Sequence, residues 1–111
     1  MSIRGIIRGL LYENDVDGRC VGFVEVGARD YAEGCTTSPV GYVEALWIDE
    51  DFRLQGIARR LMGTAADWSR ARGYREMASD TTLDNIDSQT MHEHLGFAET
   101  ERLVTFLIKL D

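Results

Sequence analysis

A glycine with arginines on both sides stands at the start of a helix-forming segment in DFRLQGIARRL, residues 51–61. The first four amide groups of a helix lack partners within the helix and lie at the positive end of its dipole, so they can bind an anion. Gly56 has no Cβ and lets an anion approach the main chain, and Arg53 and Arg59 add positive charge beside the turn. The segment predicts a phosphate-binding turn, although a loop in which Gly56 only turns the chain fits the same residues.

Other reactive patterns are absent from the sequence. It contains no G-x-x-x-x-G-K-S/T loop, no G-x-S-x-G elbow and no G-x-G-x-x-G turn, which argues against phosphoryl transfer and serine hydrolysis. His92 and His94 are two residues apart and would point to different sides of a helix. The segment DTTLDNID, residues 80–87, lacks the alternating oxygens and the glycine of a calcium loop. We predict no metal site.

Hydrophobic periodicity predicts the elements that would position the turn. VGYVEALWI, residues 40–48, is an apolar run with Glu44 in its middle and predicts a buried strand. After the turn, apolar residues recur at helical spacing, at Ile57, Leu61, Ala65 and Trp68. Gly73 then provides a C-terminal stop. A strand, a turn with glycine and a helix follow one another, as the phosphate-binding interpretation requires.

The other segments predict a mixed α/β fold. Cys20 to Val26 would return as a strand after an Asp17-Gly18 turn, because Asp-Gly supplies the positive φ angles of a hairpin. Later segments predict a strand over residues 75–79, a helix over residues 88–96 and a final strand over residues 101–110. The predicted order is β-β-β-α-β-α-β.

The first residues allow two interpretations. A helical stripe is matched by Ile3, Ile6, Ile7, Leu10 and Leu11. Gly5 and Gly9 interrupt that stripe, and residues 10–13 would fit a strand equally well.

Size and charge narrow the class of protein. With 111 residues, 44% of them hydrophobic, we expect residues 1–111 to form a single domain. The net charge of −7 argues against nucleic acid as a binding partner. The same charge suits a cationic small molecule as a ligand, and an acidic surface that keeps the protein solvated explains it equally well. No secretory signal or membrane-spanning run is present, so we expect a cytoplasmic protein with no membrane partner. Cys20 and Cys35 lack metal-ligand spacing and are expected to be reduced thiols.

The residues RLQGIA, from Arg53 to Ala58, match the Arg/Gln-x-x-Gly-x-Gly/Ala signature of the GNAT superfamily of N-acetyltransferases. Three longer segments, CTTSPVGYVEALWIDEDFRLQGIARRL, REMASDTTLDN and HEHLGFAETERLVTF, resemble its aminoglycoside 6′-N-acetyltransferase branch. The resemblance covers roughly residues 18–110. It implies a GNAT-like mixed central β-sheet flanked by helices, with acetyl-CoA as co-substrate and a primary amine of an aminoglycoside-like cation as acceptor.

The resemblance also implies which residues bind acetyl-CoA. The turn from Leu54 to Arg59 would hold the pyrophosphate, the strand from Leu46 to Ile48 would pair with the pantetheine arm, and Asn85 would contact that arm. On its own, Asn85 in LDN before a helix is ordinary capping chemistry. The full set of expected cofactor residues is Leu46, Trp47, Ile48, Arg53, Leu54, Gln55, Gly56, Ile57, Ala58, Arg59 and Asn85.

Acetyl transfer needs a neutral amine nitrogen, so a base must take a proton from the substrate ammonium. Asp80 and Glu44 match acidic positions of the resembled branch, Asp80 at the carboxyl end of its strand and Glu44 within the preceding apolar strand. We expect Asp80 to be the base and Glu44 to orient water or the ammonium, although the roles could be exchanged. Without the resemblance, Asp80 is a turn or capping residue and Glu44 a solvent-facing strand residue.

Two further catalytic groups are implied by the resemblance. A backbone N–H near Trp47 would stabilise the oxyanion of the tetrahedral intermediate. Many GNAT members carry a tyrosine before the final Leu-Gly-Phe to protonate the leaving thiolate, and His92 occupies that position here. His92 could act as the acid near neutral pH, the thiolate could take its proton from water, or His92 could be structural.

The resembled branch begins with a strand and two helices that wall the acceptor site, and this chain starts near their end. We therefore expect an N-terminally shortened fold, which leaves three alternatives: a truncated relative, a site completed by a second subunit, or an open site acting on something larger. The small core and uncovered sheet edges favour a homodimer. The rival functions are a non-catalytic acyl-CoA-binding or interaction module and a peptide or polyamine N-acetyltransferase.

Overall fold

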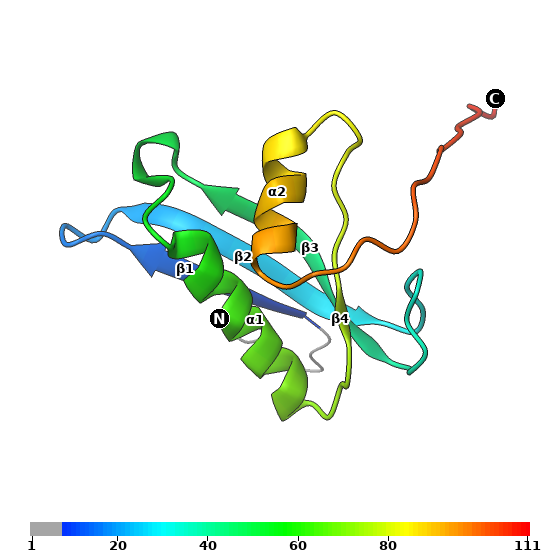
Figure 1. Cartoon of the computed structure of the whole chain (residues 1–111), viewed down its shortest axis with the longest axis horizontal. Coiled ribbons are helices and arrows are strands. Elements are labelled where there is room, and N and C mark those ends of the chain that lie inside the picture. Colours follow the sequence, from blue (N-terminus) through cyan, green and yellow to red (C-terminus); the bar gives the residue numbers. More distant parts are fainter. Residues whose placement is uncertain (1–7) are drawn as a thin grey trace. The chain divides into compact units, whose positions relative to one another are not determined.

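The computed structural model describes residues 8–111, and the chain divides into two compact units, Met1–Asp80 and Thr81–Asp111. Each unit is described by itself below, and the expectation that residues 1–111 act as a single domain stays a prediction. The element order is β1-β2-β3-η1-α1-β4-α2 (Figure 1), where η1 is a short 3-10 helix. This order matches the predicted one up to the final strand.

The first unit is built on a four-stranded mixed sheet. Its strands are β1 (Arg8–Asn14), β2 (Cys20–Arg29), β3 (Val40–Ile48) and β4 (Met77–Ala78), and they lie in that order across the sheet. Neighbouring strands are antiparallel from β1 to β3, whereas β3 and β4 are parallel. The predicted mixed sheet with an antiparallel start is therefore confirmed. The strand interpretation of residues 10–13 is also confirmed, while Ile3, Ile6 and Ile7 lie outside the described residues.

The predicted hairpin joins β1 to β2. Gly18 has φ +83° and its N–H donates to the carbonyl oxygen of Asp15, 3.0 Å away. The carboxylate of Asp15 accepts from the amides of Asp17 and Arg19, each at 2.9 Å. Local turn chemistry thus sets the pairing of the two strands.

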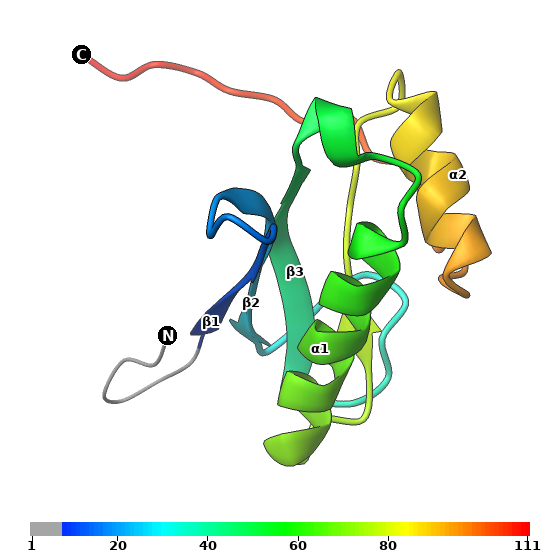
Figure 2. The same ribbon diagram turned by 90° about the vertical axis from the view of Figure 1, so that its left-hand side faces the viewer.

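Helix α1 (Ile57–Ala71) lies across one face of the sheet, as Figures 1 and 2 both show. Its apolar stripe is buried at Ile57, Leu61, Met62 and Ala65. The valines of β2, Val21, Val24 and Val26, are also buried in the core. The helix lies close to the sheet at Gly41, where a Cβ would come within 2.2 Å of Ser69 Oγ. The start of this helix at Ile57 confirms the predicted position.

A smaller apolar cluster lies beside the β3–β4 pair and consists of Ala32, Val40 and Tyr42, with Cys35 and Ala78 packed against it. Because Gly41 faces α1, strand alternation puts Tyr42 on the opposite face of the sheet. Glu76 accepts hydrogen bonds from the amides of Thr36 and Thr37, at 2.9 and 2.8 Å, and ties the preceding loop to β4.

The second unit contains α2 (Ile86–His94) and the residues after it. Asn85 is its N-cap, with its side-chain oxygen accepting from the amide of Ser88 at 3.1 Å. The helix therefore begins two residues before the predicted range of 88–96. No helix among residues 8–111 is long and apolar enough to cross a membrane.

The prediction of a final strand over residues 101–110 was wrong for this chain on its own. Residues 97–111 form neither helix nor strand. A strand needs a neighbour that accepts its backbone hydrogen bonds, and within residues 8–111 no strand lies against this segment.

Candidate functional site

The turn before α1 has the backbone conformation that an anion site needs. Gly56 is the N-cap residue, and its backbone lies in the left-handed region, with φ +80° and ψ +7°. It supplies no capping side chain. The carbonyl oxygen of Gly56 accepts from the Arg60 N–H at 3.1 Å. The amides of Ile57, Ala58 and Arg59 come before that bond and have no acceptor within the helix. They are available at the positive end of a 15-residue helix.

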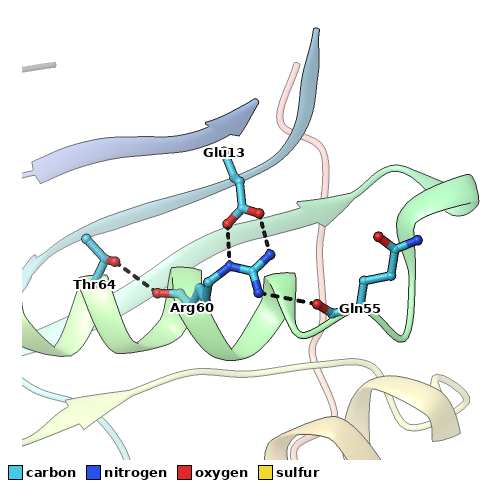
Figure 3. A network of polar contacts seen from close by, with 4 residues as sticks. All are labelled: Glu13, Gln55, Arg60 and Thr64. Atoms are coloured by element: carbon cyan, nitrogen blue, oxygen red, sulfur yellow. Dashed lines mark hydrogen bonds and ion pairs between the residues drawn. The ribbon is translucent and has the colours of Figure 1, made fainter. Parts of the chain in front are cut away.

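Arg60 holds this turn in place (Figure 3). Its guanidinium makes a two-point ion pair with the carboxylate of Glu13 on β1, with Nε 2.9 Å from Oε1. Nη1 also donates to the carbonyl oxygen of Gln55 at 3.3 Å, and the Arg60 carbonyl accepts from the Thr64 hydroxyl at 2.9 Å. Sequence reasoning missed this contact between the turn, α1 and β1.

The side chains of the turn are open to solvent. Arg53, Leu54, Gln55 and Arg59 are exposed, and Leu54 has a left-handed φ of +64°. Ahead of them, Asp49 caps η1 (Glu50–Phe52) by accepting from the Asp51 amide at 2.9 Å, and this bond lowers the pKa of Asp49. The two arginines expected to meet a phosphate, Arg53 and Arg59, are therefore exposed on this turn.

Strand β3 offers an unpaired edge beside the turn. On one side Leu46, Trp47 and Ile48 pair with β2. On the other side β4 pairs with β3 only at Gly41 and Tyr42, so within the described sheet the edge from residue 43 to residue 48 has no strand partner. This separation of β3 from β4 is the feature that an extended pantetheine arm would need. Trp47 is 41% exposed and packs against Phe23 with ring centroids 5.8 Å apart.

A β-bulge in β3 lies at Glu44. The register runs from Glu25 opposite Ala45 to Val26 opposite Val43, which leaves Glu44 as the extra residue. Bulges bend a strand and redirect a side chain, and they occur often next to active sites. The bulge lies two residues beyond Tyr42, which is the last residue of β3 that pairs with β4.

The structure brings the two predicted carboxylates into one network on the face opposite α1. Glu44 forms a two-point ion pair with Arg29, with Nε–Oε2 and Nη2–Oε1 distances of 2.9 and 2.7 Å. The Arg29 guanidinium lies 3.6 Å from the centroid of the Tyr42 ring. The Tyr42 hydroxyl donates to Asp80 Oδ2 at 2.8 Å. Glu44 and Asp80 are thus linked through Arg29 and Tyr42.

Electrostatics distinguish the members of this network. The hydrogen bond from Arg29 to Glu44 raises the pKa of the guanidinium, so Arg29 is a permanent cation. Burial and the hydrogen bond to Asp80 raise the pKa of Tyr42 to about 12, so its hydroxyl is a donor at neutral pH. Both oxygens of Glu44 meet Arg29, whereas Asp80, an exposed residue, accepts from Tyr42 through one oxygen.

Sequence reasoning missed Arg29 and Tyr42. Tyr42 and Glu44 are two residues apart in an apolar strand, a spacing that could have suggested a shared face. No comparable signal pointed to Arg29, because its approach to Glu44 depends on the β2–β3 register and on the bulge.

The remaining expected residues, Asn85 and His92, belong to the second unit. His92 Nδ1 lies 2.8 Å from the carbonyl oxygen of Ser88, so in the neutral imidazole Nδ1 carries the proton and Nε2 is the acceptor. Its ring meets Phe97 edge-on, with centroids 5.0 Å apart. Asn85 caps α2, which is the local role that its sequence context allows.

Comparison with known proteins identifies relatives along most of the chain. A model of the Acetyltransferase (GNAT) family matches residues 7–97. Aminoglycoside N(6')-acetyltransferase type 1 of Serratia marcescens is 47% identical over 92 residues, which are 82% of this chain and 63% of the relative. The protein of the same name from Salmonella typhimurium is 42% identical over 91 residues, with 81% and 63% covered. The chain therefore spans less than two thirds of the length of these curated relatives.

Solved structures resemble the fold closely. The apo crystal structure of an aminoglycoside antibiotic 6'-N-acetyltransferase from Acinetobacter haemolyticus has a TM-score of 0.86 and 36% identity, covering 95% of this chain and 72% of that chain. AAC(6')-Iy in complex with the bisubstrate analogue CoA-S-monomethyl-acetylneamine has a TM-score of 0.87 and 35% identity, covering 94% and 71%. Together with the family match, these likenesses confirm the predicted fold, and the chain belongs to the GNAT family of acetyltransferases.

Proposed function

We propose that this protein transfers an acetyl group from acetyl-CoA to the 6′-amine of an aminoglycoside. The observation that carries the proposal is the network in which Glu44, Arg29, Tyr42 and Asp80 join the two carboxylates at the point where β3 and β4 separate. The named relatives and the complex with a CoA–aminoglycoside bisubstrate analogue support this choice of donor and acceptor.

The turn and the open edge of β3 are the proposed acetyl-CoA site. Free amides at the start of α1 would receive the pyrophosphate, and Arg53 and Arg59 would add charge from the solvent side. The pantetheine arm would pair with β3 along Leu46 to Ile48, where the sheet lacks a neighbour. A backbone N–H near Trp47 would then stabilise the oxyanion.

The proposed chemistry uses Asp80 as the base. The amine nitrogen attacks the thioester carbon once Asp80 has taken a proton from the ammonium, the C–S bond breaks, and the thiolate leaves. The nitrogen loses a second proton to water as it becomes the amide. Glu44 is held by Arg29 at both oxygens and would orient the ammonium or a water molecule. The Tyr42 hydroxyl occupies one oxygen of Asp80, so the proton would go to the other oxygen. Protonation of the thiolate by His92 stays a prediction, with water as the alternative donor.

We also infer that the protein works in the cytoplasm, where acetyl-CoA is available, and that it forms a homodimer. The net charge of −7 supports a cationic acceptor, and an electrostatic contribution of this kind predicts activity that falls as salt rises.

Thiol release from acetyl-CoA with and without kanamycin tests the proposal. Asp80→Asn should lower kcat/KM by about 100-fold or more, because positioned general bases contribute roughly 10²–10⁴-fold. Asp67→Asn is the matched control, since Asp67 is an exposed carboxylate on α1 that pairs with Arg70 at 2.9 Å. An aminoglycoside with a hydroxyl in place of the 6′-amine should show no acceptor-dependent release.

Acetyl-CoA affinity, measured separately by calorimetry, separates the possible outcomes. Wild type that binds acetyl-CoA but turns over no aminoglycoside, polyamine or peptide would replace the proposal with a binding module. Turnover of peptides but not kanamycin would retain the cofactor site and reject the acceptor. Asp80→Asn with unchanged turnover would reject Asp80 as the base.

A further inference from the structure

Arg60, in the first turn of α1, uses all three nitrogens of its guanidinium in contacts within the protein. Nε and Nη2 meet the two carboxylate oxygens of Glu13, and Nη1 donates to the carbonyl oxygen of Gln55 at 3.3 Å (Figure 3). The side chain of Arg60 is nevertheless 56% exposed. Because the guanidinium is planar, a two-point contact along one edge sets the direction of the remaining nitrogen. Glu13 therefore determines where Nη1 points.

Nη1 fixes the peptide group between Gln55 and Gly56. The C=O and N–H of a trans peptide point in opposite directions, so a carbonyl oxygen turned toward Arg60 turns the Gly56 N–H away from it. The residues on both sides of Gln55 are left-handed, with φ +64° at Leu54 and +80° at Gly56. A left-handed leucine is strained and persists only where its surroundings hold it. The Leu54 side chain is fully exposed, so side-chain packing does not hold it, whereas the next carbonyl is bound by Arg60.

Glu13 reaches Arg60 because β1 and the start of α1 lie close together on one face of the sheet. In the β1–β2 register Glu13 is opposite Gly22, and a Cβ at Gly22 would come within 3.0 Å of Ile57 Cγ2. Glycine at this place lets the first residue of α1 approach the strands. The hydrogen bond from Arg60 lowers the pKa of Glu13, so this side chain is an anion at neutral pH.

We propose that Glu13 is a positioning residue for acetyl-CoA. Through Arg60 it fixes the peptide between Gln55 and Gly56, and so it aims the backbone amides of the turn at the pyrophosphate. The inference rests on the acetyl-CoA site of the proposed function and adds to it a residue 47 positions before Arg60 in the chain. Glu13 acts only through Arg60 and contacts neither the cofactor nor the acceptor.

A purely electrostatic role would give the opposite result. Pyrophosphate is anionic, so a carboxylate near the turn repels it. Removal of that carboxylate would also free the Arg60 guanidinium to bind phosphate directly. Electrostatics alone therefore predicts that Glu13→Gln binds acetyl-CoA more tightly than wild type. The positioning role predicts weaker binding, because the turn loses the contact that orients its peptide, so the sign of the change distinguishes the two.

The other end of the turn segment is attached independently of Glu13. Arg19, just after the hairpin turn, pairs with Asp49, and its guanidinium lies 5.7 Å from the centroid of the Phe52 ring. Ion pairs between exposed side chains contribute little to stability, and the pair of Glu13 with Arg60 is of this kind. We therefore expect Glu13→Gln to fold as wild type does, with matching circular dichroism and a similar urea midpoint.

Calorimetric titration of the full chain with acetyl-CoA measures the effect. Glu13→Gln should raise the dissociation constant about fivefold, the effect of losing one ordinary hydrogen bond. Arg60→Lys keeps the charge but lacks the planar fork that meets Glu13 and Gln55 together, so it should weaken binding to a similar extent. Glu99→Gln is the matched control and should bind as wild type does. Glu99 makes the same two-point contact with Arg102 in the second unit, with both bonds at 3.0 Å.

Steady-state kinetics separate positioning from a general loss of structure. In Glu13→Gln the KM for acetyl-CoA should rise about fivefold, while kcat at saturating acetyl-CoA and the KM for kanamycin stay at their wild-type values. Glu13→Gln combined with Arg60→Lys should bind no more weakly than either single variant, because both changes break one contact.

Four results would overturn the proposal. These are Glu13→Gln that binds acetyl-CoA as tightly as wild type or more tightly, Arg60→Lys that keeps wild-type affinity, losses of affinity that add in the double variant, and a kcat that falls together with the affinity. Wild type that binds acetyl-CoA but transfers no acetyl group would reject the proposed acetyl transfer and leave the binding comparison standing. Wild type that binds no acetyl-CoA would reject the proposed cofactor site and this inference with it, so the failures are distinguishable.

Discussion

Replacing Gly56 by alanine tests the turn that we assign to the pyrophosphate. At φ +80° a residue with a Cβ is strained by about 1–2 kcal/mol. The new Cβ would lie 3.3 Å from Arg60 Nη1, which donates to the Gln55 carbonyl oxygen, so the guanidinium paired with Glu13 would have to shift by a few tenths of an ångström. Alanine also restricts the unfolded chain, which offsets about 0.4–1 kcal/mol. The net expectation is a loss of roughly 1 kcal/mol in the free energy of unfolding.

Gly63→Ala is the matched control with the opposite sign. Gly63 lies inside α1, and a Cβ there meets no atom within 4 Å apart from the excluded helix backbone. Alanine in a helix interior stabilises by about 0.5–1 kcal/mol over glycine. The two variants each replace one glycine by alanine, yet their free energies of unfolding in urea should differ by about 1.5–2 kcal/mol. Their melting temperatures should lie on opposite sides of the wild-type value.

Acetyl-CoA binding gives the functional part of this prediction. Gly56→Ala should raise the dissociation constant about tenfold, the cost of weakening one charge-assisted hydrogen bond, and Gly63→Ala should leave it unchanged. Calorimetric titration measures both. Wild-type stability in Gly56→Ala would refute the left-handed turn, and wild-type affinity in a destabilised Gly56→Ala would refute its role in cofactor binding.

Two further predictions concern the face opposite α1 and the loop beside it. In an absorbance titration, Tyr42→Phe should lack the tyrosine whose pKa is about 12. The variant should also lower kcat, because Asp80 loses the hydrogen bond that positions it. An unchanged kcat would mean that the 2.8 Å hydrogen bond does not position the base. Hydrogen bonds from Thr37 lower the pKa of Glu76 from its usual 4.5, so they stabilise the fold above that pH and are lost as the pH falls below it. Glu76→Gln should flatten the decline of stability on the acid side, and parallel declines in variant and wild type would contradict this.

The elements that short-range rules define could be predicted from the sequence. The hairpin at Asp17-Gly18 and the start of α1 after Gly56 depend on residues within a few positions, and both lie where expected. Asn85 as an N-cap is equally local. The final strand could not be predicted in this way, because a strand exists only with a neighbour, and the composition of residues 101–110 does not say whether one is present.

The network around Asp80 shows the same limit within the first unit. Glu44 and Asp80 were expected from family resemblance, and neither their connection nor Arg29 follows from periodicity. A one-residue bulge determines that Glu44 meets Arg29, since the pairing of β2 with β3 skips Glu44. An alternation argument assumes no such skip and so cannot assign a partner to the skipped residue.

The bulge also connects the two halves of the proposed site. Pairing of β3 with β4 ends at Tyr42, two residues before the extra residue Glu44, and the open edge from Leu46 to Ile48 lies beyond the bulge. The same irregularity lets Glu44 meet Arg29, whose guanidinium packs on the Tyr42 ring that holds Asp80. The bulge lies between the part of β3 that pairs with β4 and the open edge proposed for the thioester arm, and it holds Glu44 of the carboxylate network. We therefore expect a change that removed the bulge to disturb both cofactor binding and proton transfer.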